Sequence, residues 1–318
     1  MTSQHASDHD SGSPMADRSA LQEIVERLWR VEDASGHYFS GVQQTVPSRA
    51  AVVGIVEDLR SVLFPGYFGE RELDEESRRW HIGATLDRVR QQLREQVRRG
   101  LCFVCEDPDP TRCAQCEAHT LVLTRAFLTR LPDIRQLLRT DVQAAYTGDP
   151  AASSPSETIL CYPGILAMTN YRIAHELHRL RLPLVPRMMT EYAHSVTGID
   201  IHPGTTIGDH FFIDHGTGVV IGETAVIGNR VRIYQGVTLG AKSFALDERG
   251  HPIKGIPRHP IIEDDVTIYS GATILGRITI GAGSVIGGNV WLTHDVPPGS
   301  RISQVEARQG EFVDGGGV

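Results

Sequence analysis

The side chains best suited to acid–base chemistry lie around His215, in the run Asp214-His-Gly-Thr-Gly218. An imidazole that titrates near neutral pH can take a proton from a substrate when a carboxylate holds its other nitrogen. Asp200 precedes His215 by 15 residues. This is a little less than one coil of a parallel β-helix, the fold that the six-residue repeat of this chain predicts. We therefore predict that Asp200 orients the ring. The alternative is a histidine that caps the domain and is hydrated by water.

A second polar group follows a break in the apolar pattern. Residues 243–259 interrupt that pattern, and Arg258 and His259 stand where it resumes. Loops on a rigid scaffold often carry binding residues, and an arginine beside a histidine suits an anion such as a carboxylate. We therefore predict an anion-binding pair. A solvated basic turn is the alternative.

Four cysteines form two Cys-x-x-Cys pairs separated by seven residues: Cys102 with Cys105, and Cys113 with Cys116. Four thiolates at this spacing can hold one tetrahedral zinc, which would be structural because no position stays open. Reduced thiols, two labile disulfides or an iron–sulfur cluster are the alternatives. Cys161 stands alone, and we expect it to be a buried helix residue rather than a nucleophile.

The pattern that positions these groups repeats every six residues. Its first positions are Ile201, Ile207, Ile213 and onward, and it resumes in phase from Val266. A period of six fits neither a helix nor a single strand, but it fits a parallel β-helix with about 18 residues per triangular coil. In the first coil this phase places His215 at a third position, where later coils have Ile or Leu. We therefore expect a histidine in place of a core residue.

The preceding part of the chain has helical spacing of its apolar residues. We predict helices over residues 21–29, 49–63, 72–99, 118–131, 132–146, 157–180 and 184–196. The domain plan is a disordered tail over residues 1–17, a helical domain over 18–198 with a cysteine knuckle at 102–116, a β-helix over 199–300 and a C-terminal tail over 301–318. The fold class is therefore α+β.

Composition excludes some partners. The chain has 318 residues and a net charge of −8, so we expect neither nucleic acid nor an anionic membrane surface as a partner. No apolar run is long enough to cross a bilayer. The polar N-terminus lacks the apolar core of a signal peptide, so we expect a cytoplasmic protein.

Five motifs together resemble one family. They are Asp200-Ile-His-Pro203, Asp214-His-Gly-Thr-Gly218, Gly222-Glu-Thr-Ala-Val226, Gln235-Gly-Val-Thr-Leu-Gly240 and Arg258-His-Pro260. Their order and spacing resemble the serine O-acetyltransferases, over roughly residues 133–298. Sugar and xenobiotic acyltransferases share the six-residue repeat but not this combination.

The resemblance implies a left-handed parallel β-helix after an all-helical domain. It implies homotrimers or dimers of trimers, with active sites in clefts between neighbouring subunits. The implied reaction transfers an acetyl group from the co-substrate acetyl-CoA to the hydroxyl of L-serine, giving O-acetyl-L-serine for cysteine biosynthesis.

The resemblance also assigns site residues. His215 would be the general base and Asp200 its partner. The residues implied to bind serine are Asp149 and Asp214 at its amine, Arg258 and His259 at its carboxylate, and Glu223 beside them. The residues implied on the coenzyme A side are Gly240, Ala241 and Lys242.

Departures from the family pattern and other functions remain open. The insertion at residues 243–259 is longer than the loop of many family members. Family members that dock into cysteine synthase end in Ile, whereas this chain ends in Val318. Cysteine synthase therefore stays a doubtful partner. The alternatives are an acyltransferase for another amino acid or a sugar, a metal enzyme resembling γ-class carbonic anhydrases with His210 and His215 as ligands, and an inactive scaffold.

Overall fold

The computed structural model describes residues 14–29, 46–69, 74–105 and 114–304. The chain divides into two compact units, Met1–Thr45 and Val46–Val318. In the first, helix α1 (Pro14–Trp29) begins inside the predicted tail, and it exposes Leu21, Ile24, Val25 and Leu28. The second unit carries all the predicted site residues. The final residues, 305–318, lie outside the described part.

Seven helices are described in the second unit, where the apolar spacing predicts six. They are α2 (Arg49–Leu63), α3 (Glu75–Phe103), α4 (Ala114–Thr129), α5 (Leu131–Gly148), α6 (Pro155–Cys161), α7 (Pro163–Arg179) and α8 (Val185–Thr197). The single helix predicted over residues 157–180 is wrong, because two helices occupy this stretch. Tyr162 precedes Pro163 and is extended (φ −83°, ψ 122°), since the proline ring disfavours helical geometry in the residue before it.

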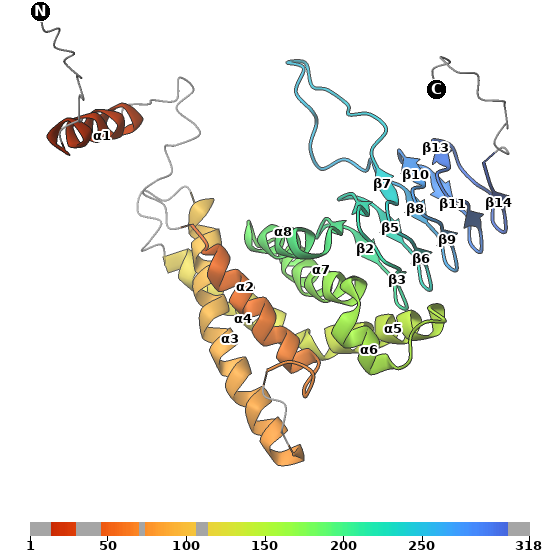
Figure 1. The fold of residues 1–318 in the computed structure, drawn as a ribbon, viewed down its shortest axis with the longest axis horizontal. Helices are drawn as coiled ribbons and strands as arrows, with labels where there is room; N and C mark the ends of the chain where they lie inside the picture. The colour runs from red at the N-terminus through yellow and green to blue at the C-terminus, as the bar shows by residue number, and fades with distance from the viewer. Residues whose placement is uncertain (1–13, 30–45, 70–73, 106–113, 305–318) are drawn as a thin grey trace, which may run out of the picture. The chain divides into compact units, whose positions relative to one another are not determined.

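Short parallel strands follow the helices and stack into three sheets (Figure 1). The strands of the first sheet are, in spatial order, β1 (Asp200–Ile201), β4 (Val220–Ile221), β7 (Thr238–Gly240), β10 (Thr273–Leu275) and β13 (Trp291–Leu292). Those of the second are β11 (Thr279–Ile280), β8 (Ile261–Ile262), β5 (Val226–Ile227) and β2 (Thr206–Ile207). Those of the third are β14 (Arg301–Ile302), β12 (Val285–Ile286), β9 (Thr267–Ile268), β6 (Arg232–Ile233) and β3 (Phe212–Ile213). The predicted fold class, a helical region followed by a left-handed parallel β-helix, is confirmed.

The β-helix encloses the apolar first positions of the repeat. Ile201, Ile213 and Val237 are among the buried residues of one continuous core. Ser284, the polar exception at a first position, is also buried, and its hydroxyl donates to the carbonyl of Pro297 at 3.0 Å. The buried hydroxyl therefore has the partner that burial requires.

The first coil is two residues longer than the 18-residue step from β4 to β7, and this changes the place of His215. Asp200 pairs with Val220, 20 positions later, whereas Val220 pairs with Thr238, 18 positions later. The two extra residues lie between β3 and β4, in the corner that contains His215. The expectation of a histidine in a core position is therefore wrong. His215 lies on an extended corner with φ of 54°, outside the apolar interior.

Side chains of α7 close the exposed end of the β-helix, beside β2. An edge strand presents unpaired backbone groups. Tyr171 donates its hydroxyl to the carbonyl of Thr205 at 2.6 Å, and Arg172 donates to the carbonyls of Ile207 and Gly208 at 2.7 and 2.6 Å. The helices therefore hold the first coil, which carries His215, through hydrogen bonds as well as apolar packing.

A buried ion pair joins α5 to α7 at the same end. Arg172 contacts Asp141 through two hydrogen bonds of 3.1 and 3.0 Å, and the two side chains are 4% and 0% exposed. Asp141 also accepts the backbone N–H of Phe211 at 3.1 Å. Every charge here has several partners, which offsets the cost of burying it.

The cysteines are only partly described. Cys102 and Cys116 are buried and Cys105 is partly buried, while Cys113 lies outside the described residues. Cys161 was expected to be buried, and this is wrong: it is exposed at the last residue of α6, because the final turn of that helix buries Thr158 and Ile159 instead. No described helix is long and apolar enough to cross a membrane.

Candidate active site

The predicted base occupies the corner between β3 and β4, residues 214–218, which we call the histidine corner. The side chain of His215 is 73% exposed in the single chain, and its Nε2 lies 3.8 Å from Oδ1 of Asp214. A carboxylate at this distance can stabilise the positive charge that the ring acquires when it accepts a proton from a substrate. An exposed imidazole beside a carboxylate can accept a proton from a bound substrate.

Asp149, which follows α5, belongs to the same corner. Its carboxylate accepts the Tyr162 hydroxyl at 2.5 Å and the backbone N–H of Ala151 at 2.8 Å. The Tyr162 hydrogen bond, then that of Ala151, hold the pKa of Asp149 below its usual range, with smaller contributions from His215 and Arg232 nearby. Asp149 is therefore ionised at neutral pH, as a site for a substrate ammonium group requires.

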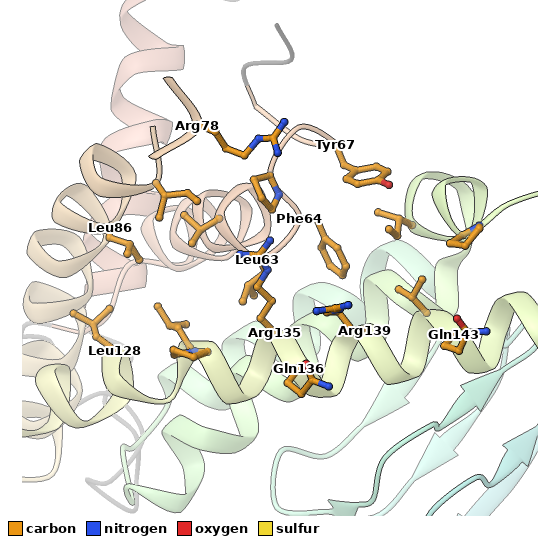
Figure 2. Close-up of a pocket in the computed structure, with 18 residues that line it drawn as sticks. Leu63, Phe64, Tyr67, Arg78, Leu86, Leu128, Arg135, Gln136, Arg139 and Gln143 are labelled. Carbon is orange, nitrogen blue, oxygen red and sulfur yellow. The ribbon is translucent and has the colours of Figure 1, made fainter. Parts of the chain in front are cut away.

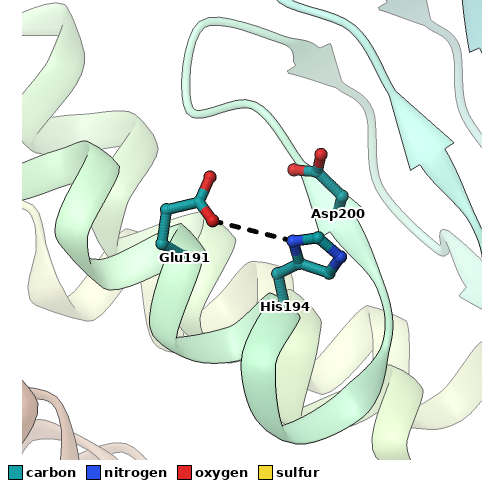
Figure 3. Close-up of side chains that lie close together, drawn as sticks. All are labelled: Glu191, His194 and Asp200. Atoms are coloured by element: carbon teal, nitrogen blue, oxygen red, sulfur yellow. Dashed lines mark ion pairs between the residues drawn. The ribbon is translucent and has the colours of Figure 1, made fainter.

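Asp200 lies in a different local group from the one predicted. Its carboxylate, a carboxylate oxygen of Glu191 and a ring nitrogen of His194 all lie within 4.8 Å of one another (Figure 3). Glu191 also contacts His194 at 3.6 Å and pairs with Arg187. Among the described residues, the carboxylate that pairs with His215 is Asp214. The pairing of Asp200 with His215 stays a prediction.

The predicted anion-binding pair lies at another corner, between β4 and β5. We call residues 222–225 together with residues 258–260 the arginine corner. The Arg258 guanidinium donates to Glu223 at 2.6 Å. Burial raises the pKa of Glu223, but the Arg258 hydrogen bond, His202 and the Arg258 charge outweigh it and leave that pKa below its usual range. Glu223 is therefore ionised, and its carboxylate holds the Arg258 guanidinium in place.

His259 is 6% exposed and lies against Thr224 in this corner. Its Nδ1 accepts the backbone N–H of Thr224 at 3.0 Å. Burial, with the neighbouring charge of Arg258, lowers the pKa of His259 to about 4. His259 is therefore neutral at physiological pH, with its proton on Nε2. It can donate one hydrogen bond to an anion without adding charge.

The residues predicted on the coenzyme A side continue along the same edge of the prism. Gly240 ends β7, Ala241 is partly buried and Lys242 is exposed. The carbonyl of Gly240 accepts the N–H of Gly276 from the next coil at 3.0 Å. This run therefore starts the long loop that returns at Arg258.

The histidine corner and the arginine corner lie at the two ends of β4. The β4 face separates them, and the four residue steps from Gly218 to Gly222 span roughly 13 Å at about 3.3 Å per residue. Arg258 is held on Glu223, so it cannot cross this face to His215. The described residues therefore present two separate polar groups, one at each corner.

His210, the second ligand of the carbonic-anhydrase alternative, lies at the third corner, between β2 and β3. Its Nδ1 is 3.0 Å from Asp209 of the same corner. His215 lies on the other side of β3. The structure gives these two histidines separate carboxylate neighbours, Asp209 and Asp214, and no shared one.

A groove of about 760 Å³ lies elsewhere, among α2, α3, α4, α5 and α6 (Figure 2). Apolar side chains such as Phe64 and Leu128 line it, together with Arg135 and Arg139. None of the predicted site residues lines this groove. We therefore do not place substrate there.

Sequence reasoning missed two residues that shape these corners. Tyr162 holds Asp149, and Thr224 holds the backbone and ring of His259. Tyr162 could have been noticed because it precedes Pro163. A residue before a proline tends to end one helix, and the proline begins the next. Thr224 was part of a quoted motif, but no role could be given to its hydroxyl without the return path of the loop.

Comparisons with known proteins agree with this architecture. Residues 259–294 match the family described as bacterial transferase hexapeptide (six repeats). The chain is 54% identical over 316 residues to the plasmid serine acetyltransferase of Synechococcus elongatus, covering 96% of this chain and 99% of that protein.

Solved structures give the same result. Serine acetyltransferase isoform 3 of Entamoeba histolytica, in complex with cysteine, matches with a TM-score of 0.68 and 36% identity over 85% of this chain and 86% of that one. Soybean serine acetyltransferase complexed with serine matches with a TM-score of 0.52 and 31% identity over 83% and 99%. The chain thus belongs to the serine acetyltransferase family of hexapeptide-repeat transferases.

Proposed function

We propose that this protein is a serine O-acetyltransferase that transfers acetyl from acetyl-CoA to the hydroxyl of L-serine, with His215 as general base. O-acetyl-L-serine would supply cysteine biosynthesis. The observation that carries the proposal is the complementarity of the two half-sites. One corner offers anionic groups and a base, and the other offers Arg258 and a neutral histidine donor.

An amino acid carries an ammonium and a carboxylate, and each needs a counterpart. We assign Asp149 and Asp214 to the ammonium, because both lie at the histidine corner and Asp149 is ionised at neutral pH. We assign Arg258 and His259 to the carboxylate, because both can donate to it. The serine hydroxyl then lies between the two corners, within reach of His215.

The chemistry follows from these positions. His215 takes the hydroxyl proton as the serine oxygen attacks the thioester carbonyl of acetyl-CoA. The new C–O bond forms, the C–S bond breaks, and coenzyme A leaves as a thiolate. The imidazolium of His215 returns the proton to the thiolate. Asp214, at 3.8 Å, stabilises the imidazolium between these steps.

Two half-sites on different corners require a second copy of the chain. In a cyclic homotrimer, the histidine corner of each copy would face the arginine corner of the next, which gives three equivalent sites. Gly240, Ala241 and Lys242 continue along the edge of the arginine corner, so acetyl-CoA would lie in the same intersubunit cleft. We propose the trimer on this geometry; pairing of trimers into hexamers is a further possibility.

Thiol release from acetyl-CoA, with and without L-serine, tests this proposal. His215→Ala should lower turnover by about 10²–10⁴, the usual effect of losing a general base. Folding serves as the control, because an exposed corner residue contributes little to stability. Near-normal turnover of this variant with L-serine would show that the base lies elsewhere.

We also propose a structural zinc at the four cysteines. It would stabilise the fold and take no part in acetyl transfer. Cys102 lies in α3 and Cys116 in α4, and both are buried, as zinc ligands usually are. The contacts of Cys113 lie outside the described residues. The zinc content of the purified protein decides this point.

A further inference from the structure

Three consecutive residues of the arginine corner, Gly222, Glu223 and Thr224, each contact the end of the long loop. Glu223 holds the Arg258 side chain at 2.6 Å. Thr224 contacts the backbone of both Arg258 and His259. Gly222 lies directly beneath the His259 ring. The end of the loop therefore rests on these three residues, which we call the seat, and does not form a free turn.

We propose that Thr224 is a positioning residue that fixes the site and tautomer of His259 for recognition of the serine carboxylate; this rests on the function proposed above. The hydroxyl of Thr224 accepts the backbone N–H groups of Arg258 at 2.9 Å and His259 at 3.2 Å. One hydroxyl oxygen has two acceptor sites, so both are used to fasten the loop return.

The remaining hydrogen of that hydroxyl has one partner. Thr224 Oγ1 lies 2.9 Å from Nδ1 of His259 and, with both acceptor sites filled, donates to it. The backbone N–H of Thr224, which can only donate, also points to Nδ1 at 3.0 Å. Nδ1 is therefore an acceptor, and the neutral ring carries its proton on Nε2. Within the described chain, Nε2 has no hydrogen-bond partner, so its N–H is available to a ligand.

Gly222, in the seat, and Arg277 also position the end of the loop. A Cβ at Gly222 would lie 2.0 Å from Cδ2 and 2.1 Å from Nε2 of His259, so only glycine leaves space for the ring. Arg277 donates to the carbonyls of Thr224 and His259 at 2.6 and 3.0 Å. The backbone of the loop return is thus held by Arg277 as well as by Thr224, and the ring is held at Nδ1.

Thr224→Val tests the role of the hydroxyl, because valine keeps the shape and removes the hydrogen bonds. We expect kcat/KM for L-serine to fall about tenfold, mainly through KM, since one partly buried hydrogen-bond set is lost. Catalysis by His215 is untouched, so kcat should change less than about twofold. Thr224→Ser should restore the wild-type KM.

A carboxylate-free substrate separates positioning from a general structural effect. L-serinamide keeps the hydroxyl and the amine but lacks the anionic carboxylate. If Thr224 acts through His259, the preference for L-serine over L-serinamide should fall about tenfold in Thr224→Val. Thr206→Val, the same change at an exposed position of β2, is the matched control. It should leave kcat/KM unchanged for both L-serine and L-serinamide.

Gly222→Ala provides the second test if Thr224→Val does not fold. It keeps the hydroxyl but displaces the ring, so it should reduce the same preference. Equal losses for both substrates, an unchanged KM for L-serine in Thr224→Val, or no recovery in Thr224→Ser would each overturn the proposal. Lack of turnover by the wild-type protein with L-serine would instead overturn the proposed function, which the Thr224 comparison does not address.

Discussion

Mixing two inactive variants should restore activity if, as we propose, each active site takes its two halves from different copies. His215→Ala destroys the histidine corner and leaves the arginine corner intact. Arg258→Ala does the reverse. In a mixed trimer, a site is intact where the histidine corner of an Arg258→Ala copy faces the arginine corner of a His215→Ala copy.

The size of the effect follows from cyclic symmetry. Any ring of three that contains both variants, in either ratio, has one such junction. Mixed trimers should therefore show about one third of wild-type turnover per trimer. The parent trimers should stay lower by about 10²–10⁴ for His215→Ala.

The assay needs pure mixed trimers. Co-expression of the variants with two different affinity tags, followed by purification on both tags, selects them. Thiol release from acetyl-CoA with L-serine is then measured per trimer. A pair of differently tagged His215→Ala copies is the control and should stay inactive. Turnover of the mixed trimers no higher than that of the parents would refute the split site, since both halves would then come from one chain.

Two further outcomes follow from side-chain contacts. The Tyr162 hydrogen bond is the main cause of the lowered pKa of Asp149, and only the ionised carboxylate attracts an ammonium. Tyr162→Phe should therefore raise that pKa, so that calorimetric affinity for L-serine is lost at a higher pH on acidification than in the wild type; an unshifted profile would argue against Asp149. Arg172→Met leaves Asp141 buried and unpaired and should cost about 3–5 kcal/mol in denaturant unfolding, whereas a loss below about 1 kcal/mol would show that the pair does not anchor the first coil.

The six-residue repeat predicted the architecture because burial in a β-helix is local and periodic. Ile207 of the first coil pairs in register with Ile227 of the next, and both face the interior. The motifs likewise indicated the family, since they combine in one order. Even so, the phase of the repeat misplaced His215. Two extra residues in one corner leave the apolar period intact on both sides and change only which residues lie between the strands.

The sequence by itself determined the β-helix, the helical region before it and the types of side chain available for serine chemistry. Only the tertiary structure decided that these side chains lie at two different corners, because which corner a residue occupies depends on coil length and loop return. Pairings such as Tyr162 with Asp149 and Thr224 with His259 join residues 13 and 35 positions apart. Such contacts are set by how coils stack and how helices pack on the first coil, and no local pattern records them.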